Sequence, residues 1–136
     1  MISAISNLGR LWFMVFGERL TAGVFVRFLD RLLRANPGRK LFLVVDGHPA
    51  HRAARVRAWA AGHAGRVELF YLPGYSPELN PDELLNQDTK QAMRKTRPFD
   101  QRQMMAQVRG HLRSRQKRPA VVKRFFEERH VRYAAA

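Results

Sequence analysis

The stretch Leu72–Glu83, which reads LPGYSPELNPDE, says more about the fold of this chain than any other segment. It directly follows a strand-like run, Val67–Tyr71, and it opens a run with helical periodicity. Asn80 is a favourable helix N-cap, and proline is favoured at the first helical position, so we expect a helix over about 81–94. The segment therefore predicts a strand, a loop and a helix in close succession.

A carboxylate also follows the preceding strand-like run, Leu41–Val45. Side chains alternate along a strand, so Phe42, Val44 and Asp46 are expected on one face. Asp46 would then emerge at the carboxyl end of its strand, where open α/β sheets place their ligands. The alternative is an ordinary turn aspartate in an Asp-Gly pair.

The chain carries a strong excess of positive charge. It has 25 Lys and Arg against 11 Asp and Glu, a net charge of +14, with a pI near 11.5. Arginine makes forked contacts to phosphate, and such basicity is typical of nucleic-acid binding, although a preference for arginine codons gives the same composition. Residues 91–136 alone hold 13 Lys and Arg and three Asp and Glu, a net charge of +10. The last third of the chain is therefore the expected basic annex to a less charged core.

Composition also excludes several classes of site and location. The 136 residues fit one domain, and the absence of cysteine excludes disulfides and thiolate zinc sites. The apolar runs are too short to span a bilayer, and the N-terminus carries no signal-peptide pattern. We therefore expect a cytoplasmic protein without a membrane span.

Periodicity predicts a mixed α/β architecture. The expected elements are a hairpin over 2–16, a helix from Thr21 to about 35, a strand at 40–45, a helix at 50–62, a strand at 67–72, the helix at 81–94, and helices at 100–116 and 119–129. Strand–helix–strand units imply parallel pairing with helices on the faces of the sheet. We expect a single domain over 1–136, with a mixed-sheet core over about 1–95 and basic helices over 96–136.

Asp46 and Glu83 are the candidate metal ligands. Mg²⁺ prefers hard oxygen ligands, and two such ions accelerate phosphodiester chemistry at sites with about three or four carboxylates. Glu18 and Asp30, the only acids before Asp46, are expected in a turn and on a solvated helix face. Glu83 has a second interpretation, as a capping-box residue that accepts from the Asn80 backbone N–H. Its position alone leaves both roles open.

Basic side chains lie close to these acids in the sequence. His48 is placed to position phosphate or water near Asp46, whereas His51 is expected to be a hydrogen-bonded turn histidine. Lys90 shares a helix face with Glu83, where it would contact phosphate or remain a plain surface lysine. The candidate nucleic-acid contacts are His48, Lys90, Arg94, Lys95, Arg113, Arg115, Lys117 and Arg118.

Two blocks carry a family resemblance. VVDGHPAH at 44–51 and LPGYSPELNPDE at 72–83 resemble the IS630 group of the Tc1/mariner transposase superfamily, and the second block is highly specific for that group. The 36 residues between Asp46 and Glu83 lie in the range expected for the second and third acids of the group. The resemblance extends over nearly the whole chain, with one departure at Asn86, where the family often has tryptophan.

The resemblance implies an RNase H-like fold and a catalytic triad of two aspartates and a glutamate. Asp46 matches the second acid and Glu83 the third, and both would hold Mg²⁺ or Mn²⁺. The implied activity is cleavage and joining of DNA strands at transposon ends. The implied partners are transposon-end and target DNA, in a bacterial cytoplasm and in contact with the nucleoid.

The first acid of the family lies on a central strand that should precede the hairpin near Ile2. Neither that strand nor the helix-turn-helix region that reads transposon ends is recognised, so we expect the C-terminal part of a catalytic domain, inactive or nearly so by itself. Open sheet edges favour pairing with another chain, so a homo-oligomer is expected. The alternatives are a non-catalytic DNA-binding module and a decayed transposase fragment.

Overall fold

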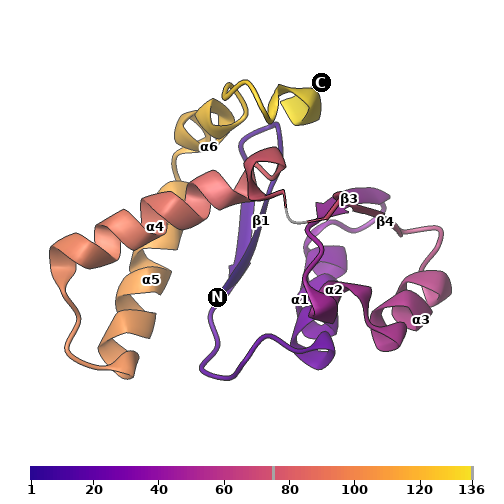
Figure 1. Ribbon diagram of the computed structural model, residues 1–136, viewed down its shortest axis with the longest axis horizontal. Coiled ribbons are helices and arrows are strands. Elements are labelled where there is room, and N and C mark those ends of the chain that lie inside the picture. The colour runs from indigo at the N-terminus through magenta and orange to yellow at the C-terminus, as the bar shows by residue number, and fades with distance from the viewer. Residues whose placement is uncertain (75, 136) are drawn as a thin grey trace. The chain divides into compact units, whose positions relative to one another are not determined.

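The computed structural model describes residues 1–74 and 76–135, and Figure 1 labels its elements. The chain divides into two compact units. We call Met1–Gly17 with Pro81–Ala136 the hairpin unit, and Glu18–Asn80 the parallel-strand unit. Each unit is built from elements that are close neighbours within it.

The hairpin unit begins with two antiparallel strands, β1 (Ile2–Ile5) and β2 (Leu11–Met14). The turn between them contains Gly9 at φ 86°, where a Cβ atom would lie 2.6 Å from the carbonyl oxygen of Pro119. Glycine is therefore needed there both for its left-handed backbone and for its lack of a side chain. The predicted hairpin is confirmed.

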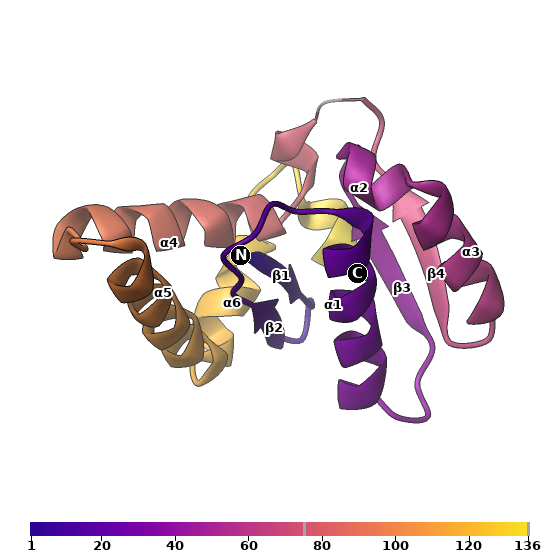
Figure 2. The ribbon, with the colours of Figure 1, turned by 90° about the horizontal axis from the view of Figure 1, so that it is seen from below.

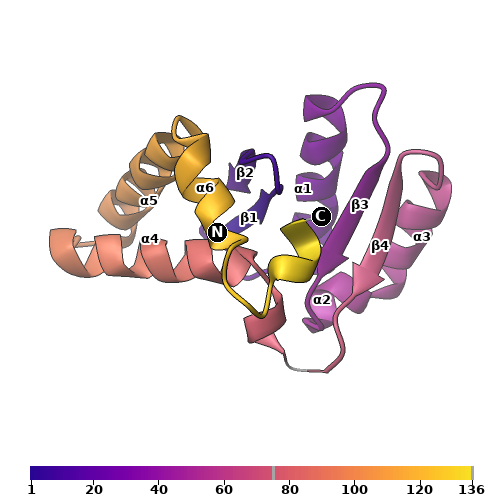
Figure 3. The ribbon, with the colours of Figure 1, turned by 90° about the horizontal axis from the view of Figure 1, so that it is seen from above.

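The rest of this unit is helical. Its elements are α4 (Asp82–Thr96), α5 (Gln101–Gln116), α6 (Pro119–Phe125) and a final 3₁₀ turn, η2 (Arg132–Ala135). α5 folds back beside α4 (Figures 2 and 3), and α6 packs against both of these helices, while α5 also contacts β2. Their apolar faces meet in one core around the fully buried side chains of Leu85, Leu112 and Val122, with Leu11 of β2 beside them.

The parallel-strand unit begins with α1 (Ala22–Ala35). Thr21 is the N-cap, since its Oγ1 accepts from the Val24 backbone N–H at 3.2 Å. Asn36 ends the helix, and its buried side-chain amide donates to the Leu32 carbonyl at 2.8 Å. The buried stripe follows the predicted 3.6-residue spacing and comprises Val24, Phe25, Val26, Phe28, Leu29, Leu32 and Leu33.

Two parallel strands follow, β3 (Leu41–Val45) and β4 (Val67–Tyr71), with Leu41 opposite Val67. Figure 1 shows α1, α2 (Pro49–Arg52) and α3 (Ala54–Gly62) on one face of this pair. The other face exposes Phe42 and Phe70, at 65% and 45% of their surface. The pairing predicted for a strand–helix–strand unit is therefore confirmed.

Arg66 fixes the start of β4 against the end of α1. Its Nη2 donates to the carbonyls of Leu33 at 3.1 Å and Asn36 at 3.0 Å, and its Nε donates to the Arg39 carbonyl at 3.2 Å. These acceptors include carbonyls that the last turn of a helix leaves without a partner. One guanidinium thus ties the end of α1 and the loop that leads into β3 to the strand that pairs with β3.

Two predicted helices need correction. The helix expected over 50–62 is broken at Ala53, whose extended backbone (φ −60°, ψ 150°) separates α2 from α3. The break is invisible in an alanine-rich run, and it buries His51 on one side and Val56 on the other. The helix expected over 119–129 ends at Phe125, because the chain turns back to bury Val131 at 1% exposure.

The strands also depart from the single mixed sheet expected. In residues 1–74 and 76–135 they form two separate pairs, one antiparallel and one parallel. Both pairs join strands that are close in sequence, a hairpin and a helical crossover, which close with the least loss of chain entropy. The mixed α/β architecture is confirmed, whereas the RNase H-like fold stays a prediction.

The two compact units meet in the sequence at Asn80, because α4 packs with α5 and α6, and the core limit near residue 95 stays a prediction. Whether the chain is one domain stays a prediction. None of the helices among the described residues combines the length and apolar character that crossing a membrane requires.

Candidate functional site

Asp46 follows β3 directly, and half of its side chain is exposed. Its Oδ1 accepts a hydrogen bond of 2.9 Å from the His48 backbone N–H. Gly47 lies against the loop that follows β4, because a Cβ atom at this glycine would be 3.1 Å from the Gly74 carbonyl oxygen. Asp46 therefore occupies the expected position, at the carboxyl end of a parallel strand and beside the loop of its neighbour.

His51 is the main correction to the predicted surroundings of Asp46. It lies in α2, is 9% exposed, and packs its ring on Phe25 with 4.3 Å between the ring centroids. Its Nδ1 is 2.9 Å from Oδ1 of Asp46, whereas its Nε2 is buried with no hydrogen-bond partner among the described residues. Burial lowers the pKa of His51, and the Asp46 carboxylate offsets this only in part. A turn histidine was expected, but the break at Ala53 turns this ring into the core.

His48 is the N-cap of α2. Its Nδ1 accepts from the Ala50 backbone N–H at 3.0 Å, and the residue as a whole is exposed. Nδ1 is consequently the acceptor in this contact. The hydrogen bond fixes the ring two residues after Asp46, and the role of His48 toward phosphate stays a prediction.

Glu83 lies in the first turn of α4 and is half-buried. Its Oε2 accepts from the Asn86 side-chain amide at 3.4 Å, a long contact. The Asn80 N–H donates instead to the Pro77 carbonyl at 3.0 Å, within the 3₁₀ turn η1 (Pro77–Leu79). The capping-box contact considered for Glu83 is therefore replaced by a turn that precedes the helix.

The acids next to Glu83 have other surroundings. Asp82 accepts from the Ser3 hydroxyl at 2.8 and 2.9 Å through its two oxygens, which joins the start of α4 to β1. Glu78 is exposed in η1. Asp82 is thus occupied in holding the hairpin unit together, a contact that sequence spacing did not indicate.

The donor chemistry of Asp46 and Glu83 suits Mg²⁺ or Mn²⁺, because both present hard carboxylate oxygens. Within residues 1–74 and 76–135, no group of three or more His, Asp or Glu side chains gathers in a way that would hold a metal ion. Asp46 belongs to the parallel-strand unit and Glu83 to the hairpin unit. They supply part of a donor set, and their joint coordination of metal stays a prediction.

Most of the residues predicted to contact nucleic acid are exposed to solvent. The exposed ones on α4, α5 and the loop after α5 are Lys90, Arg94, Lys95, Arg113, Lys117 and Arg118. Their contact with phosphate stays a prediction, since exposure alone is the common state of Lys and Arg.

Arg115 differs from this set. Its Nε and Nη2 donate to the two oxygens of Asp88 at 2.7 and 3.1 Å, and His111 lies 2.9 Å from the same carboxylate. Partial burial would raise the pKa of Asp88, but the hydrogen bond and charge of Arg115, aided by His111, hold it below the ordinary value. Arg115 therefore joins α5 to α4, which leaves less of its guanidinium for a phosphate.

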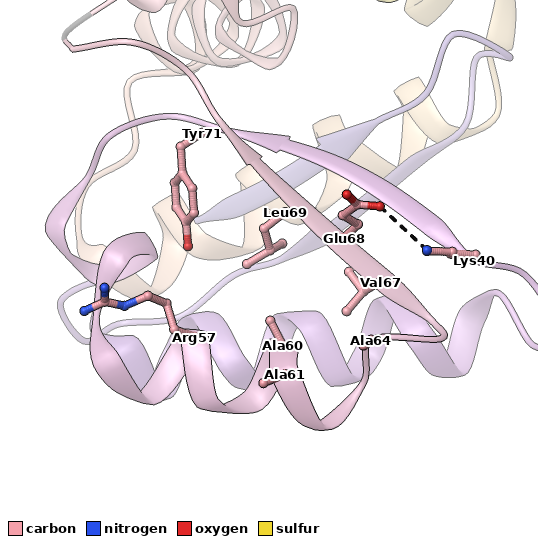
Figure 4. Close-up of a pocket in the computed structure, with 9 residues that line it drawn as sticks. All are labelled: Lys40, Arg57, Ala60, Ala61, Ala64, Val67, Glu68, Leu69 and Tyr71. Atoms are coloured by element: carbon pink, nitrogen blue, oxygen red, sulfur yellow. Dashed lines mark ion pairs between the residues drawn. The ribbon is translucent and has the colours of Figure 1, made fainter.

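A hollow of about 410 Å³ lies between α3 and β4 (Figure 4). Its lining includes the small side chains of Ala60, Ala61 and Ala64 and the apolar side chains of Val67 and Leu69. At one end, the Lys40 ammonium lies 3.6 Å from the Glu68 carboxylate. The lining contains neither Asp46 nor any other residue predicted for the site.

Comparison with known proteins adds the family. None of the curated proteins compared matches the chain. The family described as DDE superfamily endonuclease matches residues 1–106, which include β3 with Asp46 and the start of α4 with Glu83. Because this match covers most of the 136 residues, the chain belongs to the DDE superfamily endonuclease family.

Proposed function

We propose that this chain is part of the catalytic domain of a transposase of the IS630 group, which cleaves and joins DNA strands at transposon ends. One observation carries the proposal: the family match encloses both sequence blocks, 44–51 and 72–83, that resemble that group. The family implies a DNA substrate, and the net charge of +14 agrees with a polyanionic partner.

Asp46 and Glu83 are the two catalytic carboxylates in this proposal. These two side chains would hold Mg²⁺ or Mn²⁺, and a pair of such ions would supply activation of the attacking oxygen and stabilisation of the leaving oxygen of a phosphodiester. Asp46 presents its carboxylate at the end of β3, where the His48 N–H fixes one oxygen. Glu83 stands in the first turn of α4, where the positive end of the helix dipole faces its negative charge.

The basic helices bind the DNA backbone. Lys90, Arg94 and Lys95 on α4, with Arg113, Lys117 and Arg118 at the end of α5, offer exposed cations. Such contacts release counterions, so affinity falls steeply with salt, with a slope in log–log form of roughly −0.9 per neutralised phosphate. Homo-oligomers on DNA are part of the proposal, because each strand has a single hydrogen-bonded strand partner within residues 1–74 and 76–135, and unpaired strand edges favour pairing with another chain.

The test combines metal binding, DNA binding and cleavage by the purified 136-residue chain. We expect salt-dependent binding to a fluorescent DNA duplex, and Mn²⁺ binding, followed by electron paramagnetic resonance, that is weakened in Asp46→Asn and in Glu83→Gln. Glu78→Gln is the matched control, because it removes an exposed acid of the same loop. Cleavage should be absent or very slow, since two carboxylates hold the ions weakly.

The second candidate is a DNA-binding module without chemistry, favoured by the exposed cations of α4, α5 and the loop after α5. Equal Mn²⁺ binding by wild type, Asp46→Asn and Glu83→Gln, together with salt-dependent DNA binding, would establish that alternative. DNA affinity that does not change with salt would count against both. Efficient cleavage that Asp46→Asn abolishes would contradict the expected inactivity and support the catalytic role.

A further inference from the structure

The turn between α4 and α5, residues 97–100, exposes a phenylalanine almost completely. Phe99 is 95% accessible, more than any other large hydrophobic side chain of the described residues, whereas Phe42 at 65% still packs on Phe70. Single exposed apolar residues are common and need no special cause. What distinguishes Phe99 from such residues is its surroundings.

The backbone of this turn is held by hydrogen bonds. Arg97 takes up a left-handed conformation (φ 47°), and its N–H donates to the Met93 carbonyl at 3.0 Å. The Phe99 N–H donates to the Gln103 side-chain oxygen, while Asp100 caps α5 by accepting from the Gln103 N–H at 2.8 Å. A left-handed non-glycine residue costs conformational free energy, which the surrounding contacts offset.

Contacts between the two helices brace the turn further. The Thr96 hydroxyl donates to the Gln107 side chain at 2.7 Å, across from α4 to α5. The Gln101 amide donates to the Gly17 carbonyl at 3.3 Å. Phe99 thus projects from a braced turn, so little backbone entropy is lost when its ring meets a flat partner.

The charge around the ring is positive. The exposed cations within residues 94–102 are Arg94, Lys95, Arg97 and Arg102. The one acid of this segment, Asp100, uses its carboxylate to cap α5. The turn therefore combines an exposed aromatic face with a local net charge of +3, which is complementary to a polyanion that carries flat rings.

We propose that the α4–α5 turn binds DNA where a base is unstacked, with the Phe99 ring stacked on that base and the neighbouring cations on the flanking phosphates. The inference rests on the proposed DNA function and adds a contact to single-stranded or distorted DNA. Aromatic stacking accepts any base, so the turn contributes affinity without reading sequence. An amphipathic membrane anchor needs a broad apolar face, whereas this turn presents one large apolar ring.

The experiment measures affinity by fluorescence anisotropy at one salt concentration for three probes: a duplex, the same duplex with one unpaired adenine, and a single strand. We expect Phe99→Ala to weaken binding to the last two by about five- to 150-fold, the range of one base–aromatic stack, with little effect on the plain duplex. Phe99→Trp should restore binding. Phe42→Ala, which removes an exposed ring from β3, is the matched control and should bind like wild type.

The salt response separates stacking from charge. Phe99→Ala should leave the slope of log affinity against log salt unchanged, because a phenyl ring neutralises no phosphate, whereas Arg97→Ala should make it shallower. Unchanged affinity of Phe99→Ala for all probes would overturn the stacking contact and leave the proposed function standing. An equal loss on all three probes would assign Phe99 to the duplex surface and overturn base stacking.

Two further outcomes also count against the inference. If the wild-type chain binds none of the probes, the proposed function fails and this contact fails with it. Co-sedimentation with anionic phosphatidylserine vesicles that depends on Phe99, without a matching effect on DNA, would assign the turn to a membrane surface.

Discussion

At the residue scale, His51 is where burial and charge conflict. Its ring is packed on Phe25, its Nε2 is buried without a hydrogen-bond partner among the described residues, and a half-exposed carboxylate, Asp46, stands 2.9 Å from Nδ1. A buried polar atom without a partner costs about 1–3 kcal/mol. The Asp46 carboxylate offsets only part of that cost. The pKa of His51 therefore stays below its ordinary value, because burial outweighs the effect of the carboxylate.

We predict that His51→Leu stabilises the protein, raising the free energy of unfolding by about 1 kcal/mol, because leucine fills the site without unsatisfied nitrogens. His51→Ala, the control for lost volume, should instead destabilise by leaving a cavity beside Phe25. Urea unfolding followed by circular dichroism measures both. A clear loss of stability in His51→Leu would mean that the contact with Asp46 outweighs the cost of burial.

The sequence predicted the structural surroundings of some residues well and of others poorly. Asp46 was predictable, because a short apolar run with β-branched residues fixes where a buried strand ends. His51 was not, because its burial depends on the turn at Ala53, and no proline or glycine marks that turn. Phe99 was missed as well. It lies between the helices expected at 81–94 and 100–116, and nothing in the pattern showed that the ring would stay uncovered.

At the scale of elements, α4 and α5 are joined by a cluster of Asp88, Arg115 and His111. The Asp88 and Arg115 side chains are 24% and 21% exposed, so solvent screens their interaction only in part. The cluster holds the pKa of Asp88 below its ordinary value against the opposing effect of burial. A carboxyl whose pKa is lower in the folded state binds protons more readily when unfolded, so its contribution to stability is present above the unfolded pKa.

We predict that Asp88→Asn lowers the free energy of unfolding by about 2 kcal/mol at pH 7, because it leaves a partly buried guanidinium without its carboxylate. The difference from wild type should stay constant from pH 7 to pH 5 and shrink as the pH falls below about 4, through the lowered pKa of Asp88. Urea unfolding at several pH values measures this difference.

Glu68→Gln serves as the matched control for that measurement. It removes the partner of Lys40 in an ion pair whose side chains are 42% and 50% exposed, and it should change stability by less than about 1 kcal/mol. An equal loss in the two variants would show that the Asp88 cluster behaves as an ordinary surface pair.

The elements themselves were largely predictable, and their ends were less so. Thr21, Asp100 and Pro119 marked helix starts that the structure has within one residue. The end of α6 was predicted at residue 129, four residues too late. Phe126 continues the apolar spacing of the helix, but it is buried in the core from a position just after the helix ends. The two 3₁₀ turns were missed, since three or four residues carry no periodicity.

At the scale of the whole molecule, charge and strand edges oppose each other. Each strand has one hydrogen-bonded partner within the described residues, and the open edges favour association. The net charge of +14 keeps copies of the chain apart at low ionic strength. The division of the strands into two pairs was not predictable from local pattern, because periodicity shows that a strand exists but not which distant strand lies beside it.

We predict that the chain associates with itself, and more so as salt screens its charge. Multi-angle light scattering should show an average mass above 15.8 kDa that rises with protein concentration and with added sodium chloride. Phe42→Lys, which adds a charge to the exposed face of β3, should reduce that association. A mass of one chain at every concentration and salt would show that the open edges are protected.

The Arg66 guanidinium helps to fix the register of the two parallel strands, β3 and β4. Slipping β3 by a single position against β4 would carry Asp46 to the opposite side of the sheet, because side chains alternate. Arg66 opposes that slip because it donates hydrogen bonds to carbonyls at the end of α1 and to the Arg39 carbonyl just before β3. The direction in which the Asp46 carboxylate points thus depends on Arg66, which lies twenty positions further along the chain and at the other end of the strands.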